Sequence, residues 1–361
     1  MKVLLTGITG LLGAFLAKEL VKNNYKVYAL ARHSKSESAT MRMENILRFI
    51  AQDRDEYEVL RKNIFLIEGD IVYPALGIRE SKLIEQLQQE ISIVYHAAAI
   101  TGFKIPLNLA RKVNVDGTKN LIDFALKIHK KNKLKKFSHI STMYIAGNCA
   151  PDFDENDNII RKENDFNNTY ELSKYEAEKL LNEYKKDIPI SVFRPSIITG
   201  DSKNGKTNNF RLFYQPLHFF ANQLFKKFPG RLDVALNLIN IDVAASIIFN
   251  LTQNQQCNTF HVINPKPIKV KTFLKTAAEF FNFKPPKFIA KEKFDFTELT
   301  YAQKLLAQPF VPYLNLNLNF NAKKTFSILK EEKLVIPPFD KTNLLKIFSY
   351  CDVVGFIKKT K

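Results

Sequence analysis

The sequence predicts an α/β fold: a doubly wound parallel sheet, followed by a smaller, mostly helical C-terminal domain. Two observations lead to this prediction. Up to about residue 200, short β-rich segments alternate with helical patterns, as they do in repeated βαβ units. Near the N-terminus, three glycines follow an apolar run and precede a helical pattern, which is the arrangement of a strand–turn–helix that binds a pyrophosphate. We therefore expect ligands at the carboxyl ends of the strands.

Six strands are predicted in the first 200 residues, because apolar runs rich in β-branched residues are bounded there by turn residues. These strands are Lys2–Thr6, Lys26–Ala31, Ile64–Glu68, Ile91–His96, Lys136–Ser141 and Ile190–Arg194. The intervening helices are clearest at Leu12–Asn23, Thr40–Gln52, Leu107–Lys130 and Tyr170–Lys186. Residues 1–205 are thus expected to form a Rossmann-type nucleotide-binding domain.

Beyond residue 205 the alternation loosens. Residues 206–361 are expected to form the second domain, with parts of 235–265 returning to the first. Asp242 is expected to cap one of its helices, and Thr259–Ile263 to form a strand. The 30 Phe residues and the absence of Trp suggest an apolar pocket, although most of these rings could simply be core. The expected helices are Asn208–Phe228, Val243–Leu251, Val270–Phe281, Phe320–Lys330 and Lys341–Tyr350.

Composition and charge limit the classes of partner. The formal net charge of +18 could attract nucleic acid, an anionic membrane or an acidic protein, or could simply reflect a Lys-rich background. No nucleic-acid-binding motif accompanies the densest basic run, Lys127–Lys136, so nucleic acid is not expected. No run approaches the roughly 18–20 apolar residues of a membrane helix, so no transmembrane segment is expected either.

Three scattered cysteines, Cys149, Cys257 and Cys351, suit a reducing compartment and suggest neither a disulfide framework nor a zinc site. The first predicted strand begins almost at Met1 and leaves no room for a signal segment. We therefore expect a cytoplasmic protein with no metal site. A homodimer is compatible with the sequence, which does not determine the oligomeric state.

The glycine turn supplies the first candidate cofactor-binding residues. Glycine at positions 7, 10 and 13 allows a tight turn, close approach of the backbone to the phosphates and close helix–strand packing. The candidates in this turn are Thr6, Gly7, Thr9, Gly10, Leu11, Leu12 and Gly13.

The end of the second strand indicates which cofactor is bound. A site for NAD(H) would offer Asp or Glu there to the ribose 2′-hydroxyl, whereas this chain offers Arg32, whose planar fork suits a 2′-phosphate. Arg42, on the following helix, could approach the same phosphate, although either arginine could also be an ordinary surface residue. We therefore expect NADP(H) rather than NAD(H).

Three further strand ends or helices contribute candidates. Asp70, followed by Ile71, could accept a hydrogen bond from the adenine amino group or be a simple turn residue. The small residues Ala97, Ala98 and Ala99 would let the backbone lie against the cofactor, and the preceding His96 is expected to be structural. Asn114 could fix a backbone bend, hold a water, or make a purely structural hydrogen bond.

The candidate acid–base group is Tyr170, with Lys174 one helical turn beyond it on the same face. A free tyrosine has a pKa near ~10, and a nearby ammonium is expected to lower it. Hydroxyls at the end of the fifth strand, in Ser141 and Thr142, could hold a substrate carbonyl. Together with the glycine turn, this arrangement predicts a nicotinamide-dependent oxidoreductase.

These residues together resemble the extended short-chain dehydrogenase/reductase superfamily. The glycine turn, Gly69-Asp70, Asn114, Ser141-Thr142, Tyr170/Lys174 and Arg194-Pro195-Ser196 all occur in the order of that superfamily. The closer resemblance is to its thioester reductase and fatty acyl-CoA reductase branch. It covers about the first 265 residues and is strongest up to Gly205. The branch resemblance rests on the segments at residues 69–77, 140–147 and 193–205.

The resemblance implies a Thr142–Tyr170–Lys174 triad, with Ser141 as the alternative hydroxyl. It also implies that Lys174 binds the nicotinamide ribose and that the backbone of Pro195, Ser196 and Ile198 borders the nicotinamide. The second domain would then supply the substrate pocket. The implied activity is the NADPH-dependent reduction of an acyl thioester, on coenzyme A or on an acidic acyl carrier protein, to an aldehyde or an alcohol.

Other readings stay open. The same site could act on a free ketone or alcohol, such as a steroid- or flavonoid-like compound, or belong to a nucleotide-sugar epimerase or dehydratase. The sugar enzymes usually carry an Arg-Asp-Phe-Ile-x-Val-Asp-Asp stretch, and the corresponding residues 236–244 lack that arginine. A non-catalytic nucleotide-binding scaffold is a further alternative, which the intact glycine turn and Tyr–Lys pair disfavour.

Overall fold

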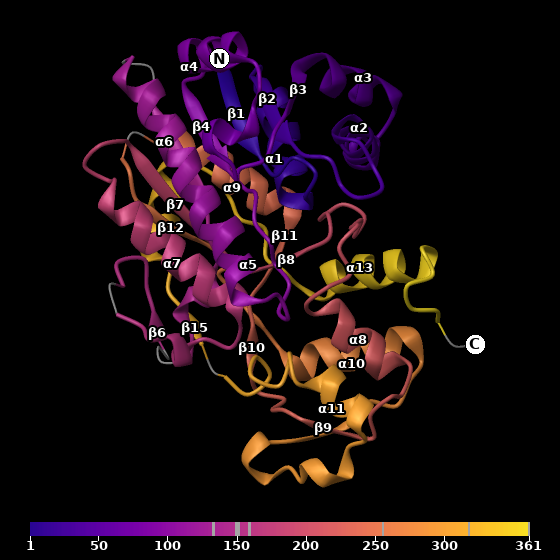
Figure 1. Cartoon of the computed structure of the whole chain (residues 1–361). Coiled ribbons are helices and arrows are strands. Elements are labelled where there is room, and N and C mark those ends of the chain that lie inside the picture. Colours follow the sequence, from indigo (N-terminus) through magenta and orange to yellow (C-terminus); the bar gives the residue numbers. More distant parts are fainter. Residues whose placement is uncertain (132–133, 149–151, 158–159, 255, 317, 360–361) are drawn as a thin grey trace.

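Seven parallel strands form the central sheet of the computed structural model, in the order β12-β7-β5-β4-β1-β2-β3 (Figure 1). The structure describes residues 1–131, 134–148, 152–157, 160–254, 256–316 and 318–359, so Cys149 and Lys133 lie outside the described residues. The order confirms the predicted doubly wound fold, and the six predicted strands all occur within two residues of their expected bounds. The strands are β1 Lys2–Thr6, β2 Lys26–Ala31, β3 Ile64–Glu68, β4 Ile93–His96, β5 Lys136–Ile140, β7 Ile190–Pro195 and β12 Thr259–Val262.

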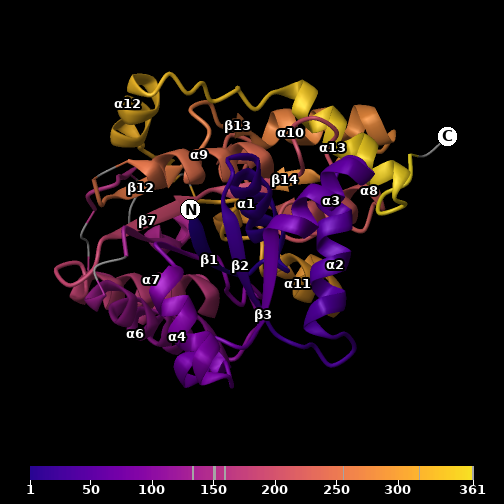
Figure 2. The ribbon, with the colours of Figure 1, turned by 90° about the horizontal axis from the view of Figure 1, so that it is seen from above.

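Helices cover both faces of this sheet, as the view from above shows (Figure 2). One face is covered by α1 Leu11–Lys22, α2 Ala39–Ile50, α3 Arg54–Asn63 and α9 Ile241–Gln253. The other is covered by α4 Ser81–Glu90, α5 Leu107–Arg111, α6 Gly117–Lys130 and α7 Thr169–Glu183. A separate buried apolar cluster fills the space between the sheet and each layer. Because helices cover both faces, the strand ends are where a ligand is expected to bind.

The predicted helix Leu107–Lys130 is interrupted. A π-helical turn at Lys112–Asp116 separates α5 from α6. Asn114 lies within this turn, where its amide bonds the backbone of Ile100 (Oδ1 to N 2.9 Å, Nδ2 to O 3.1 Å) and donates to Ser173 Oγ of α7 (2.9 Å). The bulge thus fixes a backbone bend, as such turns often do near functional sites. It ties α7 to the loop after β4.

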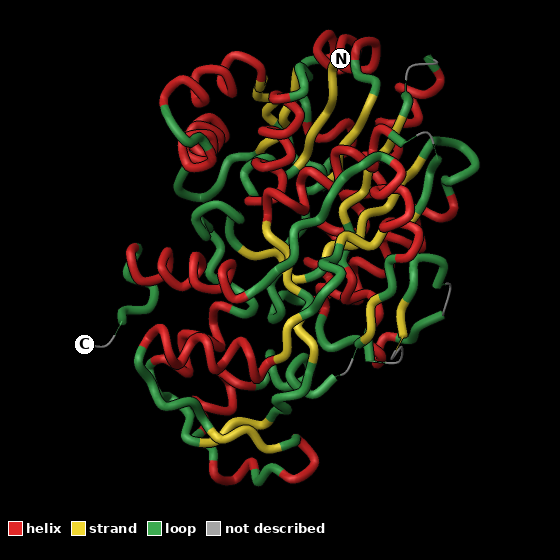
Figure 3. The backbone as a smooth tube through the Cα atoms, turned by 180° about the vertical axis from the view of Figure 1, so that it is seen from behind, coloured by secondary structure: helices red, strands yellow, loops and turns green. Residues whose placement is uncertain are grey.

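The second domain lies at the carboxyl end of the sheet and consists of helices and short pairs of strands (Figure 3). Two elements within residues 235–265 belong to the first domain's layers, because α9 packs on α1 and β12 completes the sheet edge. A third apolar cluster, rich in Phe, forms the core of the second domain. Its main helices are α8 Tyr214–Ala221, α10 Val270–Phe281, α11 Tyr301–Ala307 and α13 Lys341–Val353, whereas α12 Lys323–Glu331 packs on α9 and β12 of the first domain.

Two predictions for this region are wrong. The expected helix Asn208–Phe228 is only the short α8, since Leu212 and Gln223 on either side adopt left-handed backbone conformations (both φ 51°) and end the helical path. Asp242 does not cap α9, which starts at Ile241 with Asn240 as its N-cap. The Asp242 carboxylate instead accepts hydrogen bonds from the backbone N–H (2.9 Å) and hydroxyl of Ser202.

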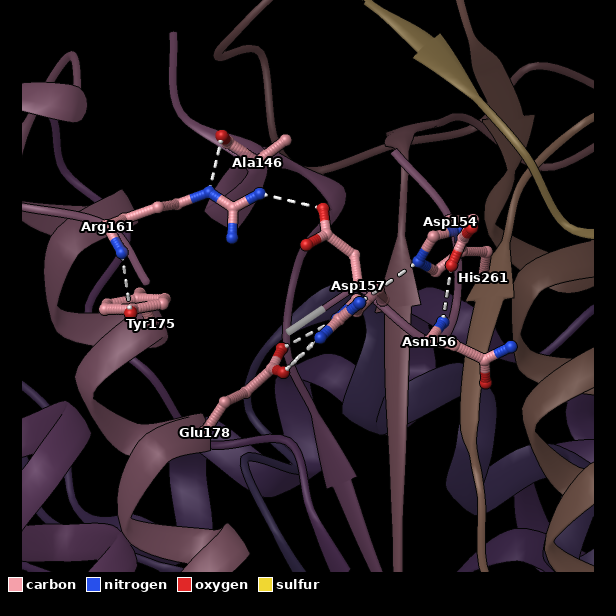
Figure 4. A network of polar contacts seen from close by, with 9 residues as sticks. Ala146, Asp154, Asn156, Asp157, Arg161, Tyr175, Glu178 and His261 are labelled. Carbon is pink, nitrogen blue, oxygen red and sulfur yellow. Dashed lines mark hydrogen bonds and ion pairs between the residues drawn. The ribbon is translucent and has the colours of Figure 1, made fainter. Parts of the chain in front are cut away.

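A buried ionic network holds α7 against the sheet (Figure 4). Glu178 of α7 pairs with Arg194 of β7 (2.8 Å), and Arg194 Nη1 lies 3.2 Å from His261 Nε2 of β12. Nearby, Arg161 pairs with Asp157 (3.0 Å) and donates to the carbonyl of Ala146 (2.8 Å). Removing one partner of a buried pair typically costs about 3–5 kcal/mol. The network therefore fixes the helix that carries Tyr170 and Lys174.

Across the described ranges, none of the helices has both the length and the apolar character needed to cross a bilayer. Within the same ranges, the structure brings together no group of three or more His, Cys, Asp or Glu side chains suited to a metal ion.

Candidate active site

The glycine turn lies between β1 and α1, and at Gly7 and Gly13 the neighbouring backbone leaves no room for a side chain. A Cβ atom on Gly7 (φ +84°) would lie 2.6 Å from the carbonyl carbon of Ala97, and one on Gly13 would lie 2.1 Å from Gly7 O. The Gly10 amide donates to Gly7 O (2.9 Å), and α1 follows with no acidic residue in its first turn. The exposed backbone N–H groups of a helix N-terminus in this position suit a pyrophosphate.

Thr6 is placed behind the turn rather than in it. Its hydroxyl is fully buried, lies 2.9 Å from His96 Nδ1 and accepts a hydrogen bond from Ala98 N–H (3.3 Å). His96 also lies 3.0 Å from the hydroxyl of Thr118, and burial lowers the pKa of His96 to about 3. The Thr6 side chain therefore positions the end of β4 instead of facing a ligand. His96 is neutral and structural.

Two arginines and an aspartate gather beside the turn. Arg42 donates to Thr9 Oγ1 (3.0 Å) and to the backbone oxygen of Arg32 (2.7 Å), and Arg32 pairs with Asp70 (3.3 Å). The Arg32 side chain stays 58% exposed. The Ile71 side chain is buried beneath α6, so only its backbone could face a ligand. The structure thus brings the predicted 2′-phosphate and adenine residues together at one edge of the turn.

Tyr170 and Thr142 meet at the carboxyl end of β5. The two side chains share a hydrogen bond, and both line the same cavity together with Ser141. The expected lowering of the Tyr170 pKa is wrong for the ligand-free chain. Burial raises the pKa of Tyr170 to about 12, partly offset by the Thr142 hydrogen bond. The phenol is therefore fully protonated near neutral pH.

Lys174 lies beneath Tyr170 in the protein interior. Its Nζ donates to the backbone oxygen of Ile140 (2.7 Å) and lies 3.0 Å from His139 Nε2. Burial lowers the pKa of Lys174 to about 7, against the opposing influence of Glu178. Sequence reasoning missed His139. The alternation of β5 was the available signal, because it turns residues 139 and 141 to the same face.

One cavity of about 350 Å³ connects the glycine turn with Thr142 and Tyr170. It begins at the glycine turn, passes Thr142 and Tyr170, and ends among aromatic and aliphatic side chains of the second domain. Some of the predicted cofactor-binding residues line this cavity, namely Gly7, Gly10, Leu11, Leu12, Gly13, Ala97, Ala99, Tyr170, Pro195, Ser196 and Ile198. The others lie outside its lining, namely Thr6, Thr9, Arg32, Arg42, Asp70, Ile71, Ala98, Asn114 and Lys174. The apolar end is formed by Phe213, Phe220, Leu236, Val270, Phe273, Leu274, Phe310 and Leu314. These phenylalanines are at once core and cavity wall.

The cavity wall also includes residues that were not predicted, among them Glu171 and Tyr313. Glu171, next to Tyr170, accepts hydrogen bonds from the Asn167 N–H (2.9 Å) and the Tyr313 hydroxyl, while Asn168 caps the helix by accepting from Glu171 N–H (3.0 Å). The Asn168 side chain thus caps α7, and the Glu171 carboxylate binds the backbone just before that cap. Burial raises the pKa of Glu171 to about 7. Because Tyr313 lies 142 positions away, its contact joins the second domain to α7 and leaves no local sequence signal.

The fold and this site define a dinucleotide-binding protein of the extended short-chain dehydrogenase/reductase type. A family model described as "Male sterility protein" matches residues 5–248. The chain belongs to this family, within the NAD(P)-dependent oxidoreductases of the extended short-chain dehydrogenase/reductase type.

Curated relatives carry reductase and synthetase names. The chain is 25% identical over 276 residues to "Fatty acyl-CoA reductase wat" of Drosophila melanogaster, covering 68% of this chain and 53% of that protein. It is 25% identical over 378 residues to a linear gramicidin synthase of Brevibacillus parabrevis, covering 99% of this chain and 7% of that protein. The chain thus spans about half of the first relative and a small part of the second.

Solved structures show the same fold over the whole chain. The terminal R domain from the myxalamid PKS-NRPS biosynthetic pathway matches with a TM-score of 0.83 at 23% identity, covering 100% of this chain and 92% of that one. A thiolation-reductase di-domain from an archaeal non-ribosomal peptide synthetase matches with a TM-score of 0.77 at 23% identity, covering 99% and 91%.

Proposed function

We propose that this chain is an NADPH-dependent reductase of acyl thioesters, carried on coenzyme A or on a carrier protein. The observation that carries the proposal is the single cavity that joins the glycine turn, Tyr170 and the apolar chamber of the second domain. A nucleotide enters at one end, an acyl chain fits the other, and a carbonyl between them meets two hydroxyl groups. The names of the fatty acyl-CoA reductase and thiolation-reductase relatives support the same substrate class.

The residues suit the reaction as follows. When bound, NADPH supplies a hydride to the carbonyl carbon. Thr142 and Tyr170 donate hydrogen bonds to the carbonyl oxygen, and Tyr170 gives up its proton as the oxygen becomes negative. The resulting hemithioacetal breaks its C–S bond to give an aldehyde and a thiol, and a second reduction would give an alcohol. The ammonium form of Lys174 would stabilise the tyrosinate left behind.

A carrier-protein substrate also fits the charge distribution. In residues 206–361, Lys and Arg outnumber Asp and Glu by more than two to one, whereas the first domain is nearly balanced. An acidic carrier would be steered toward the domain that holds the acyl chamber.

The direct test mixes the purified chain with NADPH and saturated acyl-CoAs of graded length, and follows the loss of absorbance at the cofactor band. We expect turnover that depends on chain length, because the apolar chamber has a finite depth. Free ketones and alcohols form the comparison set. If these are turned over and no acyl thioester is, the substrate assignment is wrong.

The choice of NADPH is tested by Arg42→Ala. We expect the Kd for NADPH to rise about 10–100-fold, since a charge-assisted hydrogen bond to the 2′-phosphate is lost, while the Kd for NADH stays constant. Fluorescence titration with each cofactor measures both values. Arg48→Ala is the control, because Arg48 lies on the same helix but packs on Tyr57 (4.5 Å). Equal losses for NADPH and NADH would show that Arg42 only supports the turn.

A further inference from the structure

In the part of the chain that the structure describes, the cavity lining includes one basic side chain, Arg211, and one carboxylic acid, Glu171, whose pKa burial raises to about 7. The Glu171 carboxylate is already engaged by Tyr313 and Asn167. The guanidinium of Arg211 has no hydrogen-bond or ion-pair partner among the described residues, and the side chain is exposed where the cavity opens. Arg211 therefore offers a free, planar set of donors to whatever enters.

The backbone around Arg211 is held firmly. On one side, the Phe210 ring stacks on Phe356, with ring centroids 4.4 Å apart. On the other, Phe213 packs edge-on against Phe273 of α10 (5.6 Å), and the intervening Leu212 adopts a left-handed conformation (φ 51°). Such conformations in non-glycine residues persist where the surroundings over-determine them, often at ligand-binding sites. Arg211 thus projects from a fixed turn.

The surroundings of Arg211 suit an anion. Thr207 and Asn209, from the same segment, add polar groups to this wall of the cavity. The lining also includes Gly10 at the phosphate-binding turn and Ile198 beside the expected nicotinamide position. The Thr207 hydroxyl is bound to the Asn209 backbone (N–H to Oγ1 3.1 Å), and the Asn209 side chain is exposed. A guanidinium with a neighbouring side-chain amide is well matched to a phosphate ester.

We propose that Arg211 binds a phosphate at the cavity mouth. Two sources share this chemistry: the diphosphate of the dinucleotide, and the phosphate of the phosphopantetheine arm that carries an acyl thioester. The second source rests on the proposed function, whereas the first requires only that the chain binds a dinucleotide.

The test compares a minimal pair of substrates, an acyl-4′-phosphopantetheine and the acyl-pantetheine with the same acyl chain. In the wild type, the phosphorylated substrate should have a KM about 10–100-fold lower than its partner. We expect this ratio to fall to near one in Arg211→Met, to be partly kept in Arg211→Lys, and to be fully kept in Arg79→Met. Arg79 is the matched control, because it is also exposed but does not line the cavity.

The same variants are titrated with NADPH to separate the two sources. A Kd for NADPH that rises about 10–100-fold only in Arg211→Met, with the substrate ratio unchanged, would assign the phosphate to the dinucleotide. An unchanged ratio together with an unchanged Kd would overturn the proposal. An equal rise of KM for both substrates in Arg211→Met would also overturn the proposal, because Arg211 would then act on something other than the phosphate.

Failure of the proposed function gives a different result. If the wild type turns over no thioester, calorimetric binding of 4′-phosphopantetheine against pantetheine replaces the KM ratio, and NADPH titration is unaffected. The phosphate site would again be overturned if the wild type bound 4′-phosphopantetheine and pantetheine with equal affinity and Arg211→Met left the Kd for NADPH unchanged.

Discussion

Replacing Tyr170 with Phe is expected to lower turnover of an acyl thioester by roughly a hundredfold to ten-thousandfold, the usual contribution of a general acid. The variant removes the only atom of this side chain that can donate a proton, and keeps the ring that fills the cavity wall. The Kd for NADPH should stay within about twofold, because the glycine turn and both arginines are untouched. Steady-state kinetics and fluorescence titration on the same preparation measure the two effects.

The control for this variant is Tyr184→Phe. Tyr184 follows the same helix, α7, and lies outside the cavity, so its hydroxyl can play no part in the reaction. Unchanged turnover in Tyr170→Phe would exclude Tyr170 as the acid. Unchanged behaviour in every assay, together with intact NADPH binding, would favour the non-catalytic scaffold.

The first domain could be predicted closely because its signals are local. Each of β1, β2 and β3 is a short run rich in apolar residues, so all three were predicted with their observed bounds. The turn after β1 was equally accessible, since a glycine is required wherever a Cβ atom would overlap neighbouring backbone.

The second domain was predicted less well because tertiary contacts override local patterns there. The spacing of its phenylalanines is typical of a helix across residues 208–228. The left-handed conformations fall on Leu212 and Gln223, and neither position carries a glycine that would indicate a turn. Asp is a residue type that often caps helices, but the Asp242 carboxylate accepts a hydrogen bond from the backbone N–H of Ser202, 40 positions earlier. Neither the left-handed turns nor the hydrogen bonds between Asp242 and Ser202 can be deduced from neighbouring residues.

Within the site, residue types were predictable and their environments were not. Tyr170 and Lys174 were identified from their spacing, yet burial moves both pKa values in directions that the pair alone does not suggest. No role was predicted for His139, which lies within the fifth strand. Its position 3.0 Å from Lys174 depends on how α7 packs against β5.

The glycine turn should be the least tolerant point of the domain, and Gly13→Ala tests this. Replacing glycine with alanine in a helix interior normally stabilises the helix by about 0.5–1 kcal/mol. Here its Cβ atom would lie 2.1 Å from Gly7 O, a backbone atom that cannot move without displacing the turn. We therefore expect a net loss of about 1–3 kcal/mol in the free energy of unfolding and at least a tenfold weaker Kd for NADPH.

Gly10→Ala is the matched control for Gly13→Ala, because its Cβ atom would lie 3.3 Å from the same Gly7 oxygen. A shift of a few tenths of an ångström accommodates that contact, so urea unfolding should show a clearly smaller loss of stability than in Gly13→Ala. The comparison is confined to stability, because Gly10 itself belongs to the phosphate-binding turn. If Gly13→Ala were instead as stable as the wild type and bound NADPH equally well, the turn could not have the close helix–strand packing described above. The difference between these two glycines isolates that packing, since both substitutions add one methyl group beside the same carbonyl.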